Sequence, residues 1–160
     1  MTDLASSADN LEELSKVLIK NAYDEIDKIL EAILKISRTS KYFPTIQKVV
    51  KECPITFSSS LAQIGLAHIY PPPQRIDINT ILCLPNNRIQ LYDTVAHELA
   101  HIITFNLGLR EVAHGKNWKM IAKLLGSTPD AIVADTDSVI QGYSAIRRLK
   151  RKNKLNERNP

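Results

Sequence analysis

Two histidines and a glutamate within one short segment are the residues best able to do chemistry. The segment His97-Glu98-Leu99-Ala100-His101 has the pattern H-E-x-x-H. Side chains four residues apart project from the same face of a helix, so both imidazoles can bind one metal ion. Zinc prefers nitrogen ligands in tetrahedral geometry, and a catalytic site leaves one position for water. The metal lowers the pKa of that water toward about 7, and Glu98 is placed to accept the water proton.

A third metal ligand has to come from another part of the chain, and two residues are candidates. His114 lies thirteen residues after His101, beyond Gly108, a residue type that often ends a helix. Glu111 is the alternative, because a glutamate can also complete a site that contains two histidines. The glycine at position 115 and the helix expected after it favour His114, which would then lie at a rigid turn. The expected cofactor is one catalytic Zn²⁺.

Hydrophobic periodicity predicts the helices that position these residues. Asn10 with Glu13, and Asn87 with Gln90, form capping pairs at the starts of two helices. Trp118 has apolar residues at helical spacing around it, which predicts a place in the core more than in the wall of the active site. The first helical region is either one helix or two. The expected helices cover residues 10–37, 44–50, 87–108 and 116–125, with a last helix from about residue 138.

Three segments between the second and third helices predict short strands: residues 55–57, 62–70 and 75–79. The order of helix, strands and helices predicts an α+β fold. A strand beside the active site could bind an extended peptide by backbone pairing, and the stretches 62–69 and 74–80 are both candidates.

Length and composition predict one globular domain in a reducing compartment. The chain has 160 residues, of which 44% are hydrophobic and 24% charged. No apolar run approaches the roughly 20 residues of a membrane-spanning helix, and residues 1–10 lack the features of a secretory signal. Cys53 and Cys83 are too few for a disulfide framework. We therefore expect a protein that is neither secreted nor membrane-bound, and that is cytoplasmic or associated with the nucleoid or nucleus.

Positive charge is concentrated at the C-terminus. The net charge is +4, whereas residues 147–160 alone carry seven basic residues and one acidic residue. We divide the chain into a flexible N-terminus at 1–9, a domain at 10–146 and a basic tail at 147–160. The tail could contact nucleic-acid phosphates, bind an acidic partner or be a solvated end. The candidate nucleic-acid-binding residues are Arg147, Arg148, Lys150, Arg151, Lys152 and Lys154.

The sequence around the metal motif resembles the SprT-like family of zinc metallopeptidases, which includes Spartan-type proteases that digest proteins crosslinked to DNA. The resemblance rests on residues 94–101 and on the segment 114–119, HGKNWK, and it is strongest over residues 76–126. It implies a single zincin-like α+β domain in which His97, His101 and His114 bind zinc and Glu98 is the catalytic base. It also implies a protein or peptide substrate.

The chain departs from the family in one respect. No cysteine follows Cys83 in the sequence, so we do not expect the Cys-rich zinc ribbon that many SprT-like proteins carry after the protease core. We expect a zinc metalloprotease, with DNA-bound or DNA-crosslinked proteins as one candidate substrate class. Three alternatives stay open for DNA: contact through the basic tail, contact supplied by a partner, or weak engagement. The alternative is a nucleic-acid- or protein-binding factor with a structural or vestigial zinc site. The oligomeric state is left open.

Overall fold

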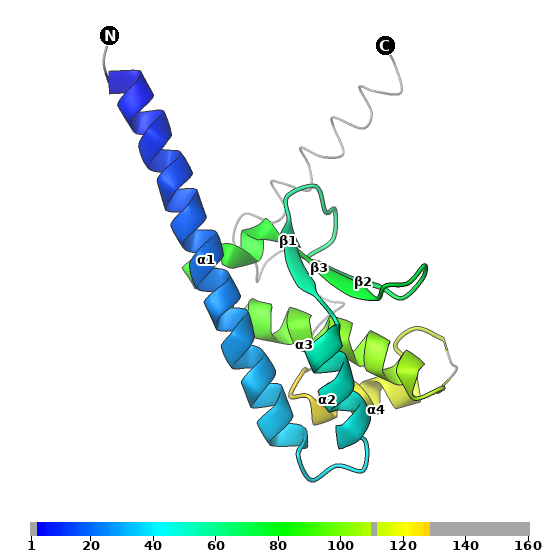
Figure 1. Cartoon of the computed structure of the whole chain (residues 1–160). Helices are drawn as coiled ribbons and strands as arrows, with labels where there is room; N and C mark the ends of the chain where they lie inside the picture. Colours follow the sequence, from blue (N-terminus) through cyan, green and yellow to red (C-terminus); the bar gives the residue numbers. More distant parts are fainter. Residues whose placement is uncertain (1–2, 110–111, 129–160) are drawn as a thin grey trace, which may run out of the picture.

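The computed structural model describes residues 3–109 and 112–128, which form an α+β fold, as predicted (Figure 1). The long helix α1 runs along one side, and α3 crosses the middle of the fold next to a small sheet. The elements are α1 (Asp3–Ser37), α2 (Phe43–Glu52), β1 (Ile55–Ser58), β2 (Gly65–His68), β3 (Arg75–Asn79), the short 3-10 helices η1 (Thr80–Cys83) and η2 (Pro85–Asn87), α3 (Arg88–Asn106) and α4 (Lys116–Leu124).

The sheet has the strand order β1-β3-β2. The central strand β3 pairs in parallel with β1, with Ile76 opposite Ile55, and antiparallel with β2, with Ile78 opposite Gly65. The three predicted strands are therefore confirmed, although β2 is shorter than the stretch 62–70. Because β3 is paired on both sides, β1 and β2 are the edge strands.

Helix α1 is one continuous helix, so the prediction of either one helix or two is resolved. It begins at Asp3, and Asn10 lies inside it, so the predicted helix start at Asn10 is wrong. Residues 3–9, expected in a flexible N-terminus, belong to the helix. The physical reason is that the chain has no Gly or Pro before Pro44, and an internal capping pattern does not stop a helix without such a breaker.

The hydrophobic core draws on all four helices and on β3. Ile29 of α1, Ile46 of α2, Ile78 of β3, Leu99 of α3 and Ile121 of α4 are all buried in one cluster. Helix α3 lies at the centre of this cluster and is buried along most of its length. Because α3 is packed on most sides, it holds the H-E-x-x-H residues in a fixed position. None of the helices in the described ranges has the length and apolar content to cross a membrane.

The ends of α3 agree only in part with the predictions. Asn87 precedes the helix, but its side chain makes no capping bond, and its Nδ2 donates to the Ile81 carbonyl at 2.9 Å. The predicted capping pair at this helix is therefore wrong, because Asn87 is used to tie η1 to the start of α3. Gly108 (φ 70°) adopts the left-handed conformation just after α3, which confirms it as a helix stop, and Gly126 (φ 83°) does the same just after α4. The helix predicted from about residue 138 lies outside the described residues.

Candidate metal centre

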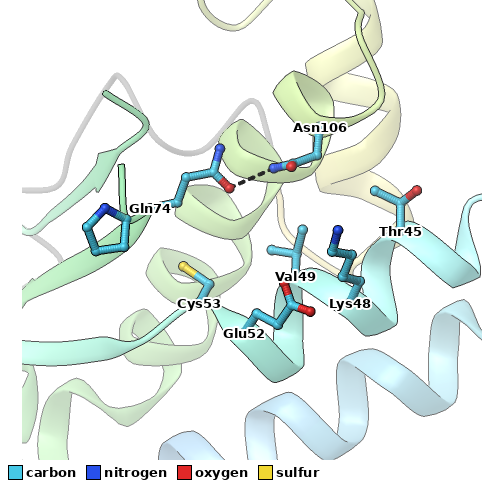
Figure 2. A pocket seen from close by; sticks show the side chains of 8 residues that line it. Thr45, Lys48, Val49, Glu52, Cys53, Gln74 and Asn106 are labelled. Carbon is cyan, nitrogen blue, oxygen red and sulfur yellow. Dashed lines mark hydrogen bonds between the residues drawn. The ribbon is translucent and has the colours of Figure 1, made fainter. Parts of the chain in front are cut away.

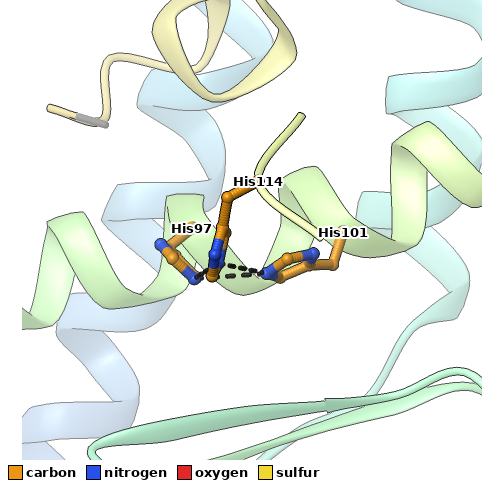
Figure 3. A group of neighbouring side chains, drawn as sticks. All are labelled: His97, His101 and His114. Atoms are coloured by element: carbon orange, nitrogen blue, oxygen red, sulfur yellow. Dashed lines mark hydrogen bonds between the residues drawn. The ribbon is translucent and has the colours of Figure 1, made fainter. Parts of the chain in front are cut away.

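Three histidines meet at one point beside α3. His97 and His101 project from the same face of the helix, and His114 reaches them from the loop before α4 (Figure 3). The Nε2 atoms of His97 and His101 are 3.2 Å apart, and each is 3.1 Å from Nε2 of His114. The structure thus brings His114 to the predicted pair. The alternative ligand, Glu111, lies outside the described residues.

The triangle of nitrogens fits a metal ion better than it fits hydrogen bonding. A neutral imidazole carries one N–H, so three Nε2 atoms cannot all be satisfied by bonding to one another. Zinc–nitrogen bonds of about 2.0–2.1 Å in tetrahedral geometry place the ligand nitrogens about 3.3 Å apart, close to the observed separations. Three imidazoles therefore form a suitable donor set for one tetrahedral ion with a fourth position left over.

The protonation states of these histidines also suit a metal. Burial, reinforced by the neighbouring His101 and His114, lowers the pKa of His97 to about 3. Burial and the nearby His114 lower the pKa of His101 to about 4. Both imidazoles are therefore neutral near pH 7, and their lone pairs are available to a cation without loss of a proton.

A left-handed backbone conformation turns His114 toward α3. Its φ is 62°, a region in which few residue types other than glycine are found, although histidine is one of the more tolerant. Gly115, at the N-cap of α4, donates its N–H to the Val112 carbonyl at 3.0 Å and closes the turn. The strained residue is thus the one that completes the cluster, as is common at functional sites.

Trp118 packs against all three histidines. Its side chain is buried, and its ring centroid lies 4.5 Å from that of His114, 4.7 Å from that of His97 and 5.2 Å from that of His101. The predicted core position is confirmed. The sequence prediction missed that the same ring also forms one wall of the metal centre, so core and site are not alternatives at this position.

Glu98 lies beside the cluster and is not one of its three members. Its Oε1 is 3.9 Å from Nε2 of His97, and its Oε2 accepts a hydrogen bond of 2.9 Å from the Ala67 N–H of β2. Burial raises the pKa of Glu98 to about 7, and the Ala67 N–H opposes part of that increase. A carboxyl group with such a pKa can both accept and release a proton near neutrality.

A glycine allows β2 to lie this close to α3. A Cβ atom at Gly65 would be 2.6 Å from Cγ2 of Thr94 and 3.0 Å from Cγ of Glu98. The contact between Ala67 and Glu98 was not predicted from the sequence, because a backbone N–H donor leaves no trace in side-chain type. The sequence likewise gives no signal for which helix Gly65 faces.

Among the described residues, His68 is the one histidine outside the cluster. His68 bonds through Nε2 to Asp77 at 2.7 Å, so the fourth histidine of the chain serves the sheet. The six candidate nucleic-acid-binding residues, Arg147, Arg148, Lys150, Arg151, Lys152 and Lys154, lie outside the described residues, and their role stays a prediction.

A family model described as the SprT-like family matches residues 36–138, well over half of the chain. The match contains all three clustered histidines and Glu98. No curated protein and no solved structure matches the sequence.

Proposed function

The chain belongs to the SprT-like family, and from this premise we propose that it is a zinc-dependent metalloprotease with Glu98 as general base. The family suggests a metalloprotease-type domain. The observation that carries the finer proposal is the convergence of three histidine side chains, of which His97 and His101 have lowered pKa values, beside a buried carboxyl group whose pKa is about 7.

His97, His101 and His114 are the residues that would hold the zinc ion. When bound, zinc supplies a Lewis acid that lowers the pKa of a water molecule and polarises a peptide carbonyl. Neutral imidazole is a ligand that suits zinc, whereas Mg²⁺ and Ca²⁺ prefer oxygen. The buried Trp118 ring restricts the movement of all three imidazoles.

Glu98 is positioned to move the proton. The Ala67 N–H fixes Oε2, and Oε1 is left facing His97, on the side of the ligand nitrogens. We infer that Oε1 accepts the proton of the attacking water and that the carboxyl group then donates it to the leaving amine. A pKa near 7 makes both transfers accessible at neutral pH.

The sheet topology favours β2 as the strand that binds the substrate. Of the two stretches considered, residues 74–80 contain β3, which is paired on both sides and cannot accept a peptide. β2 is an edge strand whose outer side faces Glu98, and the Ala67 N–H on that side is already bonded to Glu98, so a peptide would have to pair with the other backbone groups of this edge. An extended peptide paired with this edge would lie next to the general base. Protein or peptide chains are therefore the proposed substrates.

The positive charge of residues 147–160 supports DNA-bound or DNA-crosslinked proteins as the substrate class. The rival function is a binding factor with a structural zinc site. Such a site has no need of a buried carboxyl group beside its ligands, so the position of Glu98 favours hydrolysis.

The test combines metal content with cleavage of casein and of the protein itself, with and without DNA. Wild type and Glu98→Gln protein are expected to bind one zinc per chain, and Glu98→Gln is expected to cleave about 100-fold more slowly or worse, because proton transfer is lost. Equal turnover by zinc-loaded Glu98→Gln protein would contradict the mechanism. Bound zinc without cleavage under any condition would instead support the binding factor.

A second variant tests the ligand set. His114→Ala is expected to weaken zinc binding by about 100-fold or more, because loss of a ligand exceeds the 10–100-fold effect of losing an outer partner. Competition with a chelator measures the affinity. An unchanged affinity for zinc would mean that the third ligand is Glu111 or another residue.

A further inference from the structure

Two aromatic side chains beside the metal centre are exposed and in contact with each other. The side chain of Tyr70 is 72% exposed and that of Phe105 is 41% exposed. Their ring centroids are 5.2 Å apart, and the rings are nearly perpendicular. We call this pair the aromatic platform. Adjoining exposed aromatic rings are a feature of binding surfaces more than of ordinary protein surface.

The aromatic platform and Glu98 lie along the same boundary between β2 and α3. Strand β2 and the two residues that follow it run beside helix α3 in the same direction: Gly65 faces Thr94, Ala67 bonds to Glu98, and Tyr70, just beyond the strand, packs on Phe105. From the first of these contacts to the last, the strand path and the helix path each advance about 16 Å. The platform is therefore the continuation of the same strand–helix boundary at which Glu98 is held.

The distance to the metal centre is short. Phe105 follows His101 by four residues, as His101 follows His97, so one helical turn of about 6 Å separates the platform from the nearest ligand on α3. An extended peptide advances about 3.3 Å per residue. A peptide paired with β2 would therefore bring to the platform a side chain about two or three residues from the bond being cleaved.

Hydrogen bonds hold the platform in place before any substrate binds. Asn106 donates through Nδ2 to Oε1 of Gln74 at 2.8 Å (Figure 2) and to the Ile102 carbonyl at 2.8 Å. These bonds fix the segment between β2 and β3 to the end of α3. A cavity of about 320 Å³ adjoins the Gln74–Asn106 bond, but Lys48 and Glu52 contribute to its lining. Apolar selectivity has to come from the platform.

We propose that the aromatic platform selects substrates with a large apolar side chain two or three residues from the scissile bond. The proposal rests on the protease function proposed above. Such a side chain would remove apolar surface from water both on the substrate and on the two rings. The polar groups that hold the platform are neutral amides, whereas surfaces that stack nucleic-acid bases combine aromatic rings with basic groups. A peptide is therefore the favoured ligand.

A peptide mixture varied at the positions around the scissile bond tests the proposal, with products quantified by mass spectrometry. Zinc-loaded wild type is expected to prefer Phe or Leu over Ser about tenfold at one of the two positions. Tyr70→Ala and Phe105→Ala are expected to reduce this ratio to about one. Ile89→Ala removes another exposed apolar side chain, 83% exposed at the opposite end of α3, and is expected to keep the ratio. Thermal unfolding verifies that each variant is folded.

A second readout does not need turnover. Calorimetry measures the binding of a Phe-containing peptide and its Ser counterpart to zinc-loaded Glu98→Gln protein, with and without Phe105→Ala. The expected tenfold difference in Kd disappears when Phe105 is replaced. The side of the cleaved bond on which the preference occurs gives the direction of the peptide, and antiparallel pairing with β2 predicts the N-terminal side.

These experiments distinguish a failure of the platform proposal from a failure of the proposed protease function. Glu98-dependent cleavage with the same preference in wild type and Phe105→Ala would overturn the platform and leave the protease intact. Absence of Glu98-dependent cleavage would overturn the proposed function, and equal Kd values for the two peptides would then overturn the platform as well. Loss of single-stranded DNA binding in Phe105→Ala, with unchanged peptide preference, would assign the rings to nucleic acid and also overturn the proposal.

Discussion

At the scale of single residues, the position of Glu98, the proposed general base, depends on the absence of a side chain at Gly65. A methyl group at Gly65 would lie 2.6 Å from Cγ2 of Thr94 and 3.0 Å from Cγ of Glu98. Gly65→Ala is therefore expected to push β2 away from α3, break the Ala67–Glu98 bond and lower kcat by about 100-fold, the effect of a displacement of roughly 1 Å. Zinc content is expected to stay at one ion per chain.

A double variant distinguishes local crowding from general damage. Thr94→Ser removes Cγ2, the atom closest to the added methyl group, and Gly65→Ala/Thr94→Ser is expected to recover part of the lost kcat. Thr94→Ser alone is the matched control, with kcat close to that of wild type. If Gly65→Ala cleaves as fast as wild type, the close approach of β2 does not position Glu98.

The protonation of the site predicts how the metal-free protein responds to acid. The pKa values of His97 and His101 fall from 6.5 to about 3 and about 4 on folding, so the unfolded chain binds more protons as the pH drops below 6.5. The free energy of unfolding therefore decreases with acidification. Glu98 acts in the opposite sense, because its pKa rises from 4.5 to about 7 and its stabilising contribution is lost as the pH rises through 7.

Urea unfolding at a series of pH values from 7.5 to 4.5, with a chelator present, measures how these three side chains change the free energy of unfolding. Wild type is expected to lose stability on acidification, and Glu98→Gln is expected to lose it more steeply, because the opposing contribution is gone. A stability independent of pH in both proteins would contradict the presence of buried neutral imidazoles.

At the scale of elements, the two halves of α1 differ in how deeply their apolar side chains are buried. Ile29 is buried in the core, whereas Leu14 is 55% exposed, and the N-terminal end of α1 extends beyond the rest of the described fold (Figure 1). Ile29→Ala is expected to lower the free energy of unfolding by about 2–5 kcal/mol, because it leaves a cavity. Leu14→Ala is the matched control, with an expected change within about 0.5 kcal/mol. Chemical denaturation measures both, and a similar cost at the two positions would show that the N-terminal half of α1 is covered in solution.

The elements that the sequence predicts well are those whose signals are local. Apolar periodicity identifies α3 and α4, alternation identifies β3, and the glycines at 108 and 126 mark two helix ends. The start of α1 and the role of Asn87 were predicted wrongly. In both cases the pattern of a cap was present, but helix propensity in one and a hydrogen bond to Ile81 in the other decided the outcome.

In the candidate site, too, the features with a local sequence signal were predicted and the features that depend on distant contacts were not. The spacing of His97 and His101 on a helix is enough to predict a shared ligand position, and His114 needs only a turn between two helices. The pairing order β1-β3-β2 and the bond from Ala67 to Glu98 depend on contacts between distant segments. No local pattern encodes them, so β2 could be chosen over β3 as the peptide-binding strand only from the three-dimensional arrangement.

At the scale of the whole molecule, the family match ends at residue 138, before the basic segment begins. We predict that the basic tail contributes non-specific DNA affinity. Replacing Arg147, Arg148, Arg151 and Lys152 by Gln is expected to weaken binding and to reduce the slope of log K against log salt by about 0.9 for each lost phosphate contact. Replacing Lys16, Lys20, Lys28 and Lys35 of α1 by Gln removes the same number of charges and is the matched control. Equal salt slopes in the two variants would contradict a role of the tail in DNA binding.

Trp118 is the only tryptophan in the sequence, and its ring touches all three histidines of the metal centre. Any intrinsic tryptophan fluorescence of the protein therefore originates at this site. An imidazolium ion quenches a neighbouring indole far more strongly than a neutral imidazole does, and a bound cation changes the surroundings of the ring in its own way. The emission of the unlabelled chain is therefore expected to change when the proposed metal ion binds and when these histidines are protonated.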